Sequence, residues 1–381
     1  MIGNWNYPTS IRFGAGRIRE IALHGRAAGM ARPLLVTDAG LATHPMIERA
    51  LGYLRTDGLA AELFADIRSN PVGGNVEAGV AAYRAGQHDG VIALGGGSAL
   101  DVGKVIAFMS GQSRPMWDFE DVGDWWTRAD PDGIAPIIAI PTTSGTGSEV
   151  GRAGVITHEE SHTKKIIFHP RMMPTITLCD PELTLGLPAH LTAATGMDAL
   201  SHCLEAYCAP EYHPMADGIA AEGMRLVKEA LPTATHHGSD IAARSSMMAA
   251  AAMGATAFQK GLGGMHALAH PIGAVFDTHH GLTNAVLMPY VLRFNRSAIE
   301  VRIARLAAYL EISGGFDGFL GWILTLRAEI GIPHTLAALK IDADKADLIA
   351  AMAVDDPSAG GNPIKLDVAA TRRIFDEAMA G

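Results

Sequence analysis

The stretch "VIALGGGSALDVGK", residues 91–104, joins an apolar run to three glycines and then to a helical pattern. The apolar run has the length and composition of a buried strand. Ser98 stands where the N-cap of the following helix is expected, and Asp101 comes three residues later. Glycines let the backbone approach an anion closely, and a helix N-terminus offers free N–H groups with a partial positive charge. The stretch therefore predicts a strand, a turn and a helix that together bind a phosphate group.

This glycine turn differs from two well-known phosphate loops. It is not a strict GxGxxG sequence, and Lys104 is followed by Val105 where a Walker A loop has the Ser or Thr that binds magnesium. A strand that enters a helix through glycines is also common as a purely structural turn. Whether the turn binds phosphate or is only structural therefore has to be judged from the sequence around the neighbouring strands.

Two further apolar runs, 33–38 ("PLLVTD") and 134–143 ("IAPIIAIPTT"), alternate with helical stretches at 74–86 and 99–109. Strands that alternate with helices predict βαβ units and a parallel sheet. We therefore expect a Rossmann-like fold in the first half of the chain.

Polar groups also follow the ends of these strands. Asp38 ends the first run, where an acidic residue can accept hydrogen bonds from the ribose of an adenosine. The loop "PTTSGTGSEV", residues 141–150, offers hydroxyl groups and backbone donors after the last run. Each feature alone is most often a helix cap or a turn. Three such loops at successive strand ends of one sheet are typical of nucleotide binding in α/β folds.

The sequence pattern changes once along the 381 residues. After about residue 185 the chain is rich in Ala, Met and Leu at helical spacing, and β-branched runs become scarce. The length also exceeds that of a usual single domain. We expect a dinucleotide-binding α/β domain at 1–185 and an all-helical domain at 186–381, with a cleft between them.

Composition excludes several classes of function. A net charge of −10 argues against a nucleic-acid or anionic-membrane partner, since such surfaces attract clustered Lys and Arg. Cys179, Cys203 and Cys208 form no CxxC pair, so we expect a reducing compartment. The amino terminus "MIGNWNYPTSIRFGAG" lacks the pattern of a signal peptide, and no apolar run reaches the roughly 18 residues that cross a bilayer. These features predict a soluble, cytoplasmic protein.

Acidic and histidine side chains recur at helical spacing in the second half. Asp198 and His202 in "GMDALSH" are four residues apart, so both side chains leave the same face of a helix. His266 and His270 repeat that spacing, and "HHG" places His280 at the start of the next helical pattern. A carboxylate with imidazoles suits Fe²⁺ or Zn²⁺, and the lack of cysteine ligands favours an open, catalytic site. Any one of these histidines alone is more often a hydrogen-bonded or surface residue.

Six motifs, in this order, resemble the iron-containing (group III) alcohol dehydrogenases: "GGGSALDVGK", "PTTSGTGSEV", "DPELTLGLP", "GMDALSHCLEAY", "GLGGMHALAHPIGA" and "HHGLTNAVLMPY". That family includes lactaldehyde reductases, propanediol dehydrogenases and butanol dehydrogenases. The resemblance extends from "PTSIRFGAG" to "GGNPIKL", which is nearly the whole chain. It implies a dehydroquinate synthase-like architecture of two domains, with the site in the cleft.

The resemblance also implies roles for individual residues. The four metal ligands fall on Asp198, His202, His266 and His280, while His279 is expected beside the site and not as a ligand. His270, which precedes Pro271 and is therefore expected at a bend, matches the catalytic histidine near the nicotinamide ribose. The remaining matches are to cofactor contacts: Gly96, Gly97, Ser98 and Asp101 for the pyrophosphate, Thr142 and Thr143 for the adenine and phosphate, Lys164 for the ribose. Asp38 matches the position where an acid favours NAD over NADP, because it repels a 2′-phosphate.

The implied reaction is the interconversion of an alcohol and its aldehyde by hydride transfer to NAD. The resemblance implies that Fe²⁺, or Zn²⁺ or another divalent ion, polarises the substrate oxygen, and that His270 passes on the proton. A dehydroquinate synthase-like lyase is one alternative, but its first metal ligand is typically a glutamate, where this chain has Asp198. A metal-dependent hydrolase is another, but it would leave the three nucleotide-type loops unexplained. The family also implies a homodimer or a larger homo-oligomer.

The resemblance implies that small residues, Gly151, Ala153 and Ala257, border the substrate, with Phe258 and Met265 nearby as an apolar lining. They favour a short, uncharged primary alcohol or aldehyde. Lys260 and Arg152 raise the alternative of a small carboxylated semialdehyde, but long cationic side chains usually reach water. We therefore expect both to be solvated surface charges.

Overall fold

The computed structural model describes residues 9–161 and 163–381. Residues 1–8 lie outside this range, and with them part of the segment on which the signal-peptide prediction rests. The described chain forms two compact units. Of the described residues, one unit contains 9–143 and 147–185, and the other contains 144–146 and 186–381.

A six-stranded sheet forms the centre of the first unit, and all its strand pairs are parallel. In spatial order the strands are β1 (Ser10–Phe13), β8 (Ile176–Cys179), β5 (Ile137–Pro141), β4 (Gly90–Gly95), β2 (Pro33–Val36) and β3 (Glu62–Phe64). Three of these strands, β2, β4 and β5, coincide with the apolar runs that predicted them, and β4 begins one residue earlier than the quoted stretch. The prediction of a parallel α/β sheet is therefore confirmed.

Alternate residues of the central strands face two different layers of helices. Leu35 and Ile92 pack on one face with α1 (Ile21–Ala27) and α2 (Pro45–Thr56). Leu34 and Val91 pack on the other face, where helices α3 (Gly73–Ala85) and α4 (Gly97–Met109) cover the sheet. Because both faces are buried, these strands are continuous apolar runs and not alternating ones.

Helix α4 begins earlier than the sequence suggested. Gly96, and not Ser98, occupies the N-cap position, and no side chain caps this helix end. The prediction that Ser98 is the N-cap was therefore wrong. The glycine turn closes one residue after the end of β4, so Ser98 already lies in the first helical turn. The first amides of α4 consequently keep the exposed donors that an anion would need.

A two-stranded antiparallel hairpin, absent from the prediction, follows the loop after β5. It consists of β6 (Ala153–His158) and β7 (Thr163–Phe168). The buried ammonium group of Lys104 in α4 donates to the carbonyl oxygens of Ser148, at 2.9 Å, and of Ala153. Lys104 is therefore a structural residue that holds the start of the hairpin to α4.

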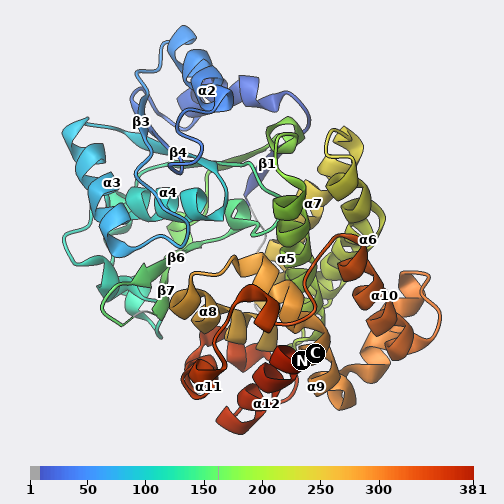
Figure 1. Cartoon of the computed structure of the whole chain (residues 1–381). Coiled ribbons are helices and arrows are strands. Elements are labelled where there is room, and N and C mark those ends of the chain that lie inside the picture. The colour runs from blue at the N-terminus through green and yellow to red at the C-terminus, as the bar shows by residue number, and fades with distance from the viewer. Residues whose placement is uncertain (1–8, 162) are drawn as a thin grey trace. The chain divides into compact units, whose positions relative to one another are not determined.

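The second unit consists of helices. These are α5 (Ala189–Cys208), α6 (Pro214–His236), α7 (Ile241–Ala257), α8 (Gly264–Phe276), α9 (His280–Tyr309), α10 (Gly315–Glu329), α11 (Ala346–Asp355) and α12 (Val368–Ala380). Figure 1 shows α6 and α7 beside α5 within this unit. Helix α5 is buried on every side over most of its length, as expected of a central helix.

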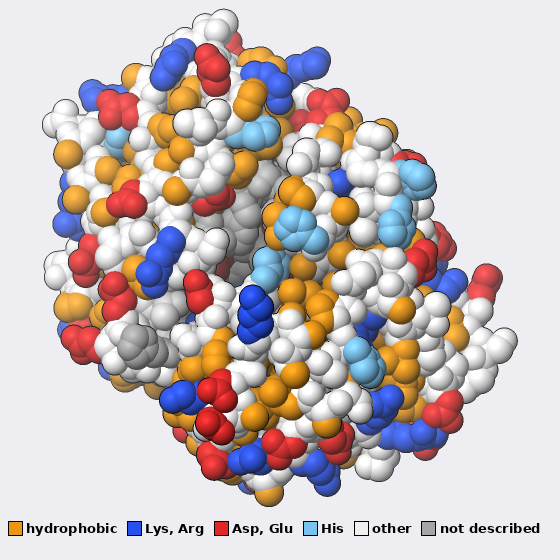
Figure 2. All heavy atoms as spheres, in the orientation of Figure 1, with side chains coloured by type: hydrophobic (Ala, Val, Ile, Leu, Met, Phe, Trp, Pro, Cys, Tyr) orange, Lys and Arg blue, Asp and Glu red, His pale blue; other side chains and the backbone are white. Residues whose placement is uncertain are grey.

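Figure 2 shows acidic and basic side chains mixed across the visible face of the molecule. Among residues 9–161 and 163–381, no helix combines the length and the apolar character needed to cross a membrane.

Candidate functional site

Helix α5 carries the first two site residues. Asp198 and His202 are one helical turn apart, and both side chains are almost completely buried. A buried carboxylate needs a positively charged or hydrogen-bonding partner, because desolvation of an isolated charge is costly. Their common face is therefore the place to look for a cation or for donor groups.

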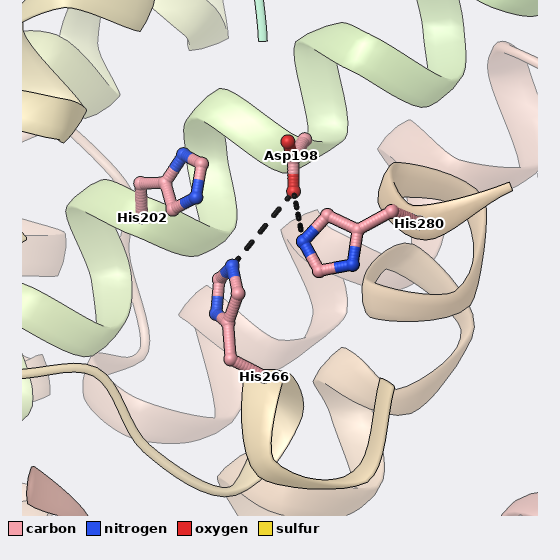
Figure 3. Close-up of side chains that lie close together, drawn as sticks. All are labelled: Asp198, His202, His266 and His280. Carbon is pink, nitrogen blue, oxygen red and sulfur yellow. Dashed lines mark ion pairs between the residues drawn. The ribbon is translucent and has the colours of Figure 1, made fainter. Parts of the chain in front are cut away.

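Two other helices bring His266 and His280 to the same place. Figure 3 shows the four side chains pointing toward a common centre, from α5, α8 and α9. The Oδ1 atom of Asp198 lies 3.9 Å from Nε2 of His266 and 3.7 Å from Nε2 of His280. One ligand atom from each of the four residues lies within 4.8 Å of all the others. This donor set, one carboxylate and three imidazoles without a thiolate, fits Fe²⁺ or Zn²⁺.

Gly281 allows this convergence. A Cβ atom added there would lie 2.4 Å from the carbonyl oxygen of Ala194 and 2.9 Å from the Cβ atom of Asp198. Any side chain at this position would push the start of α9 away from α5. The glycine of "HHG" thus brings His280 within reach of Asp198.

Asn284, one turn after His280 on α9, is also part of the site. Its amide nitrogen lies 3.0 Å from Oδ1 of Asp198, 3.1 Å from Nε2 of His266 and 3.2 Å from Nε2 of His280. The side chain is completely buried. The NH₂ group has two hydrogens and can donate to two of these three atoms at a time, so it links α9 to the candidate ligands around it.

Burial and neighbouring carboxylates shift the pKa values of two of the imidazoles in opposite directions. Burial lowers the pKa of His202 to about 4, so its ring is neutral at pH 7, as a metal ligand must be. Burial also acts to lower the pKa of His266, but the nearby carboxylates of Glu205 and Asp198 outweigh it and raise the pKa overall. A metal ion competes with a proton for the same imidazole nitrogen, so metal binding depends on pH.

Glu205, which the sequence did not single out, contacts Nδ1 of His266, the ring nitrogen that does not face Asp198. Its Oε2 atom lies 2.7 Å from Nδ1 of His266, and the side chain is almost completely buried. Glu205 is three residues after His202 in α5, but its partner lies 61 residues away in the sequence. A helical acid near a ligand is common, so nothing in the local pattern marks this one.

His270, the predicted catalytic residue, forms a dyad with Asp356, another residue that the sequence did not single out. Nδ1 of His270 lies 2.8 Å from Oδ2 of Asp356, while Oδ1 of Asp356 accepts the amide N–H of Ser358 at 2.8 Å. Burial alone would raise the pKa of Asp356, but His270 and Ser358 lower it overall. The ring of His270 stacks on that of His280, with centroids 5.2 Å apart. The catalytic candidate thus borders the ligand set, and α8 continues as a helix through Pro271.

His279 is exposed and is not among the four residues whose ligand atoms converge. As the N-cap of α9, it accepts the amide N–H of Leu282 through Nδ1 at 3.4 Å. Its place outside the ligand set agrees with the sequence-based expectation.

The loops predicted to bind a nucleotide meet at one edge of the sheet. Asp38 follows β2, and one of its carboxylate oxygens would lie 3.3 Å from a Cβ atom added at Gly95. Thr143 is similarly close to Gly96, and the amide of Thr142 donates to the carbonyl oxygen of Gly95 at 2.9 Å. Burial raises the pKa of Asp38 above its usual value. The predicted loops therefore lie together at the carboxyl ends of β2, β4 and β5, the edge at which α/β folds bind nucleotides.

Two of the predicted cofactor residues already have protein partners. Asp101 accepts the hydroxyl of Ser148 and, at 3.0 Å, the amide of Val155, so both its oxygens are engaged. Lys164 in β7 donates to the side chain of Asn70 at 2.9 Å. The cofactor roles of Asp101 and Lys164 remain predictions.

The cations considered for an acidic substrate lie in two different settings. Lys260 is buried and forms an ion pair with Asp217 at 2.6 Å, so the expectation of a solvated charge was wrong. The side chain packs inward because Asp217 and the carbonyl oxygen of Tyr207 replace its water. Arg152 is partly exposed, and its guanidinium lies 5.4 Å from the ring centre of Phe168.

Apolar side chains flank the ligand set. The ring of Phe258 lies 5.1 Å from that of His202, and Ala257 and Met265 are buried. Of the proposed lining residues, Phe258 is therefore placed beside a ligand. Gly151 and Ala153 belong to the other unit, where Lys104 lies close to both.

Known proteins are similar to this chain over nearly its whole length. Residues 8–181 match the family model described as iron-containing alcohol dehydrogenase, and residues 192–379 match the C-terminal part of the Fe-containing alcohol dehydrogenase family. The 4-hydroxybutyrate dehydrogenase of Cupriavidus necator is 39% identical, over 98% of this chain and 99% of that protein. The NAD-dependent methanol dehydrogenase of Bacillus methanolicus is 32% identical, over 99% of this chain and 100% of that protein. The crystal structure of a 1,3-propanediol oxidoreductase superposes with a TM-score of 0.94, at 34% identity and with full coverage of both chains.

Proposed function

This chain belongs to the iron-containing alcohol dehydrogenase family, and from that membership we propose that it interconverts a short-chain primary alcohol and its aldehyde with NAD(H). The observation that carries the proposal is the convergence of Asp198, His202, His266 and His280 from three helices, beside the His270–Asp356 dyad. A hydrolase would need the metal set but not the glycine turn with Asp38 and Thr143 at the strand ends.

When bound, the divalent ion supplies a Lewis acid for the substrate oxygen, and NAD⁺ supplies a hydride acceptor. The residues of the chain position a proton-transfer group and shield the candidate ligands. Asp356 holds Nδ1–H of His270, so Nε2 is the nitrogen left to take up or release a proton. Phe258 keeps one side of the ligand set apolar.

NAD(H) is our choice over NADP(H). Asp38 supports it, because its charge at the nucleotide edge would repel a 2′-phosphate. The name of the NAD-dependent methanol dehydrogenase relative supports it as well. We also propose Fe²⁺ as the metal, a cytoplasmic location, and a homodimer or larger homo-oligomer that binds no partner besides its small substrates.

A small carboxylated semialdehyde is the second candidate substrate. The identity of 39% with a 4-hydroxybutyrate dehydrogenase favours it. The ion pair of Lys260 with Asp217 counts against Lys260 as the group that binds the carboxylate. We therefore keep the uncharged substrate first.

A substrate panel tests the proposal. The protein, loaded with Fe²⁺ or Zn²⁺, is assayed with NADH or NADPH and with butanal or succinic semialdehyde. We expect turnover with NADH and a higher kcat/KM for butanal. A preference for succinic semialdehyde above tenfold would reverse the ranking, and no NAD(H)-linked turnover of any short alcohol or aldehyde would contradict the proposed function.

A further inference from the structure

We propose that Glu205 is a positioning residue that sets both the tautomer of His266 and the place of helix α8. The inference rests on the proposed function only in assuming that the site binds a divalent ion. It is tested by metal binding without alcohol or nucleotide, so its failure is distinguishable from a failure of the proposed activity.

The carboxylate of Glu205 accepts three hydrogen bonds. Oε2 accepts from the amide of Gly263 at 2.9 Å and faces Nδ1 of His266 at 2.7 Å. Oε1 accepts from the amide of Met265 at 2.6 Å. Because a carboxylate has no hydrogen to donate, Nδ1 of His266 must carry the proton. The lone pair of that ring is then on Nε2, the nitrogen that faces Asp198.

A second contact agrees with this tautomer. The amide nitrogen of Asn284 lies 3.1 Å from Nε2 of His266, and an amide N–H needs an acceptor there. Glu205 behind the ring and Asn284 in front of it therefore select the same tautomer. A histidine with its second nitrogen bonded to a carboxylate is a stronger and better oriented metal ligand.

The same carboxylate also caps α8. The amides of Gly263 and Met265 belong to the start of this helix, whose orphan N–H groups need acceptors, and no residue of α8 itself caps it. The amide between them, that of Gly264, donates to Oδ1 of Asn362 at 3.0 Å.

Asn362, the second cap of α8, pairs with Asn295 of α9 through two amide hydrogen bonds of 2.8 and 2.9 Å. Glu205 thus joins the position of the helix to the orientation of its ligand, and Asn362 affects the helix alone.

Variants of Glu205 and of Asn362 can therefore distinguish a residue that positions His266 from one that only caps α8. Glu205→Gln keeps the size of the side chain and one oxygen that can accept an amide N–H of α8. With that oxygen in the place of Oε2, Gln would still accept from the amide of Gly263 and from Nδ1 of His266, and its NH₂ group would face the amide of Met265. The negative charge that makes the imidazole a stronger metal ligand would be lost. Asn362→Ala removes one cap of α8 and leaves the contact between Glu205 and His266 in place.

The experiment measures the Kd of Zn²⁺ and Co²⁺ by chelator competition, together with the Tm of the metal-free protein, for wild type, Glu205→Gln, Glu205→Asp and Asn362→Ala. We expect Glu205→Gln to weaken metal binding by roughly 10- to 100-fold. Asn362→Ala should change Kd by less than about threefold, although its metal-free Tm falls at least as far as that of Glu205→Gln. Glu205→Asp, which keeps the carboxylate, should bind metal more tightly than Glu205→Gln.

Two results would overturn the inference. One is a Kd for Glu205→Gln equal to that of wild type. The other is an equal loss of affinity in Asn362→Ala, which would mean that the stability of α8 alone controls the site. If Glu205→Gln does not fold, Glu205→Asp decides, because its shorter side chain draws the carboxylate away from His266. A Kd shifted further than that of Asn362→Ala supports the proposal, and a wild-type Kd contradicts it.

Discussion

His279 and His280 are neighbours in the chain but have different structural positions. His280 begins α9 and faces Asp198, whereas His279 is the exposed N-cap of the same helix. Successive residues at a helix start point in different directions, so only one of the two can face α5. This pair offers a matched comparison for the ligand set.

We predict that His280→Ala loses most of its bound metal and most of its activity while the fold is retained. His279→Asn is the control, because Asn is a good N-cap and the residue lies outside the ligand set. Elemental analysis after loading with Fe²⁺ or Zn²⁺ measures both. Wild-type metal content in His280→Ala would remove that residue from the ligands.

A second prediction concerns Glu149, which is buried in the first unit near Lys104. Burial raises the pKa of its carboxyl to about 7. Between pH 4.5 and 7 the unfolded chain releases this proton while the folded protein keeps it, so stability falls as pH rises through this window and levels off above it. Glu149→Gln should therefore match wild type near pH 5 and be the more stable at pH 8, by at most about 3 kcal/mol.

Denaturant unfolding at the two pH values measures this difference. Glu160→Gln, an exposed position, serves as the control and should show no such pH dependence. A wild-type protein that gains stability relative to Glu149→Gln between pH 5 and pH 8 would show that the carboxyl is ionised when folded.

The sequence identifies those site residues whose spacing repeats a helical turn. Asp198 with His202 is such a case, and so is His266 with His270. Glu205 and Asp356 escape this reasoning, because each acts through a hydrogen bond to a residue 61 or 86 positions away. Ser98 was misplaced because the helix can start at any of several glycines, and only packing selects the start.

At the scale of the elements, the carboxyl ends of β2, β4 and β5 gather the predicted nucleotide loops. Parallel strands make this meeting predictable, because consecutive strand ends fall on one edge. The β6–β7 hairpin was not predictable in the same way. Its strands are only partly buried, so their pattern lacks the continuous apolar run of the central strands.

We predict that Asp38→Asn and Asp38→Gly narrow the preference for NAD over NADP. Both remove the negative charge that would meet a 2′-phosphate, an effect of roughly 1–3 kcal/mol. Oδ1 of Asp38 accepts the amide N–H of Leu41 at 3.1 Å, and Asn keeps an oxygen that can do the same. Asp38→Asn therefore tests the loss of charge without the loss of this turn hydrogen bond. The ratio of kcat/KM for the two cofactors is the measurement. Equal use of NAD and NADP by wild type would contradict the assignment.

For the whole molecule, the ligand set connects helices that are far apart in the sequence. Asp198 and His202 on α5, His266 on α8 and His280 on α9 would share one ion. The helical character of the second half and the change of pattern near residue 185 were readable from the sequence. The pairing of particular helices was not, because an apolar helix face fits many partners.

We predict that metal stabilises the folded protein. At a free metal concentration of 100 times Kd the gain is about 2.7 kcal/mol, which raises the Tm of a unit of this size by roughly 5–10 °C. Thermal scans with Zn²⁺, with EDTA and with Mg²⁺ measure it. Mg²⁺ should have little effect, since it prefers oxygen ligands. An unchanged Tm with Zn²⁺ would mean that the four residues do not bind the ion when folded.

Residues 144–146 belong to the helical unit although they interrupt the first one. A Cβ atom added at Gly145 would lie 2.8 Å from the Cβ atom and from the carbonyl oxygen of Thr195, so this short segment fits closely against α5. A single crossover after residue 185 would therefore not separate the two units cleanly. A chimera that takes its helices from another member of the family should inherit residues 144–146 from the same parent, and recombination between relatives meets the same constraint.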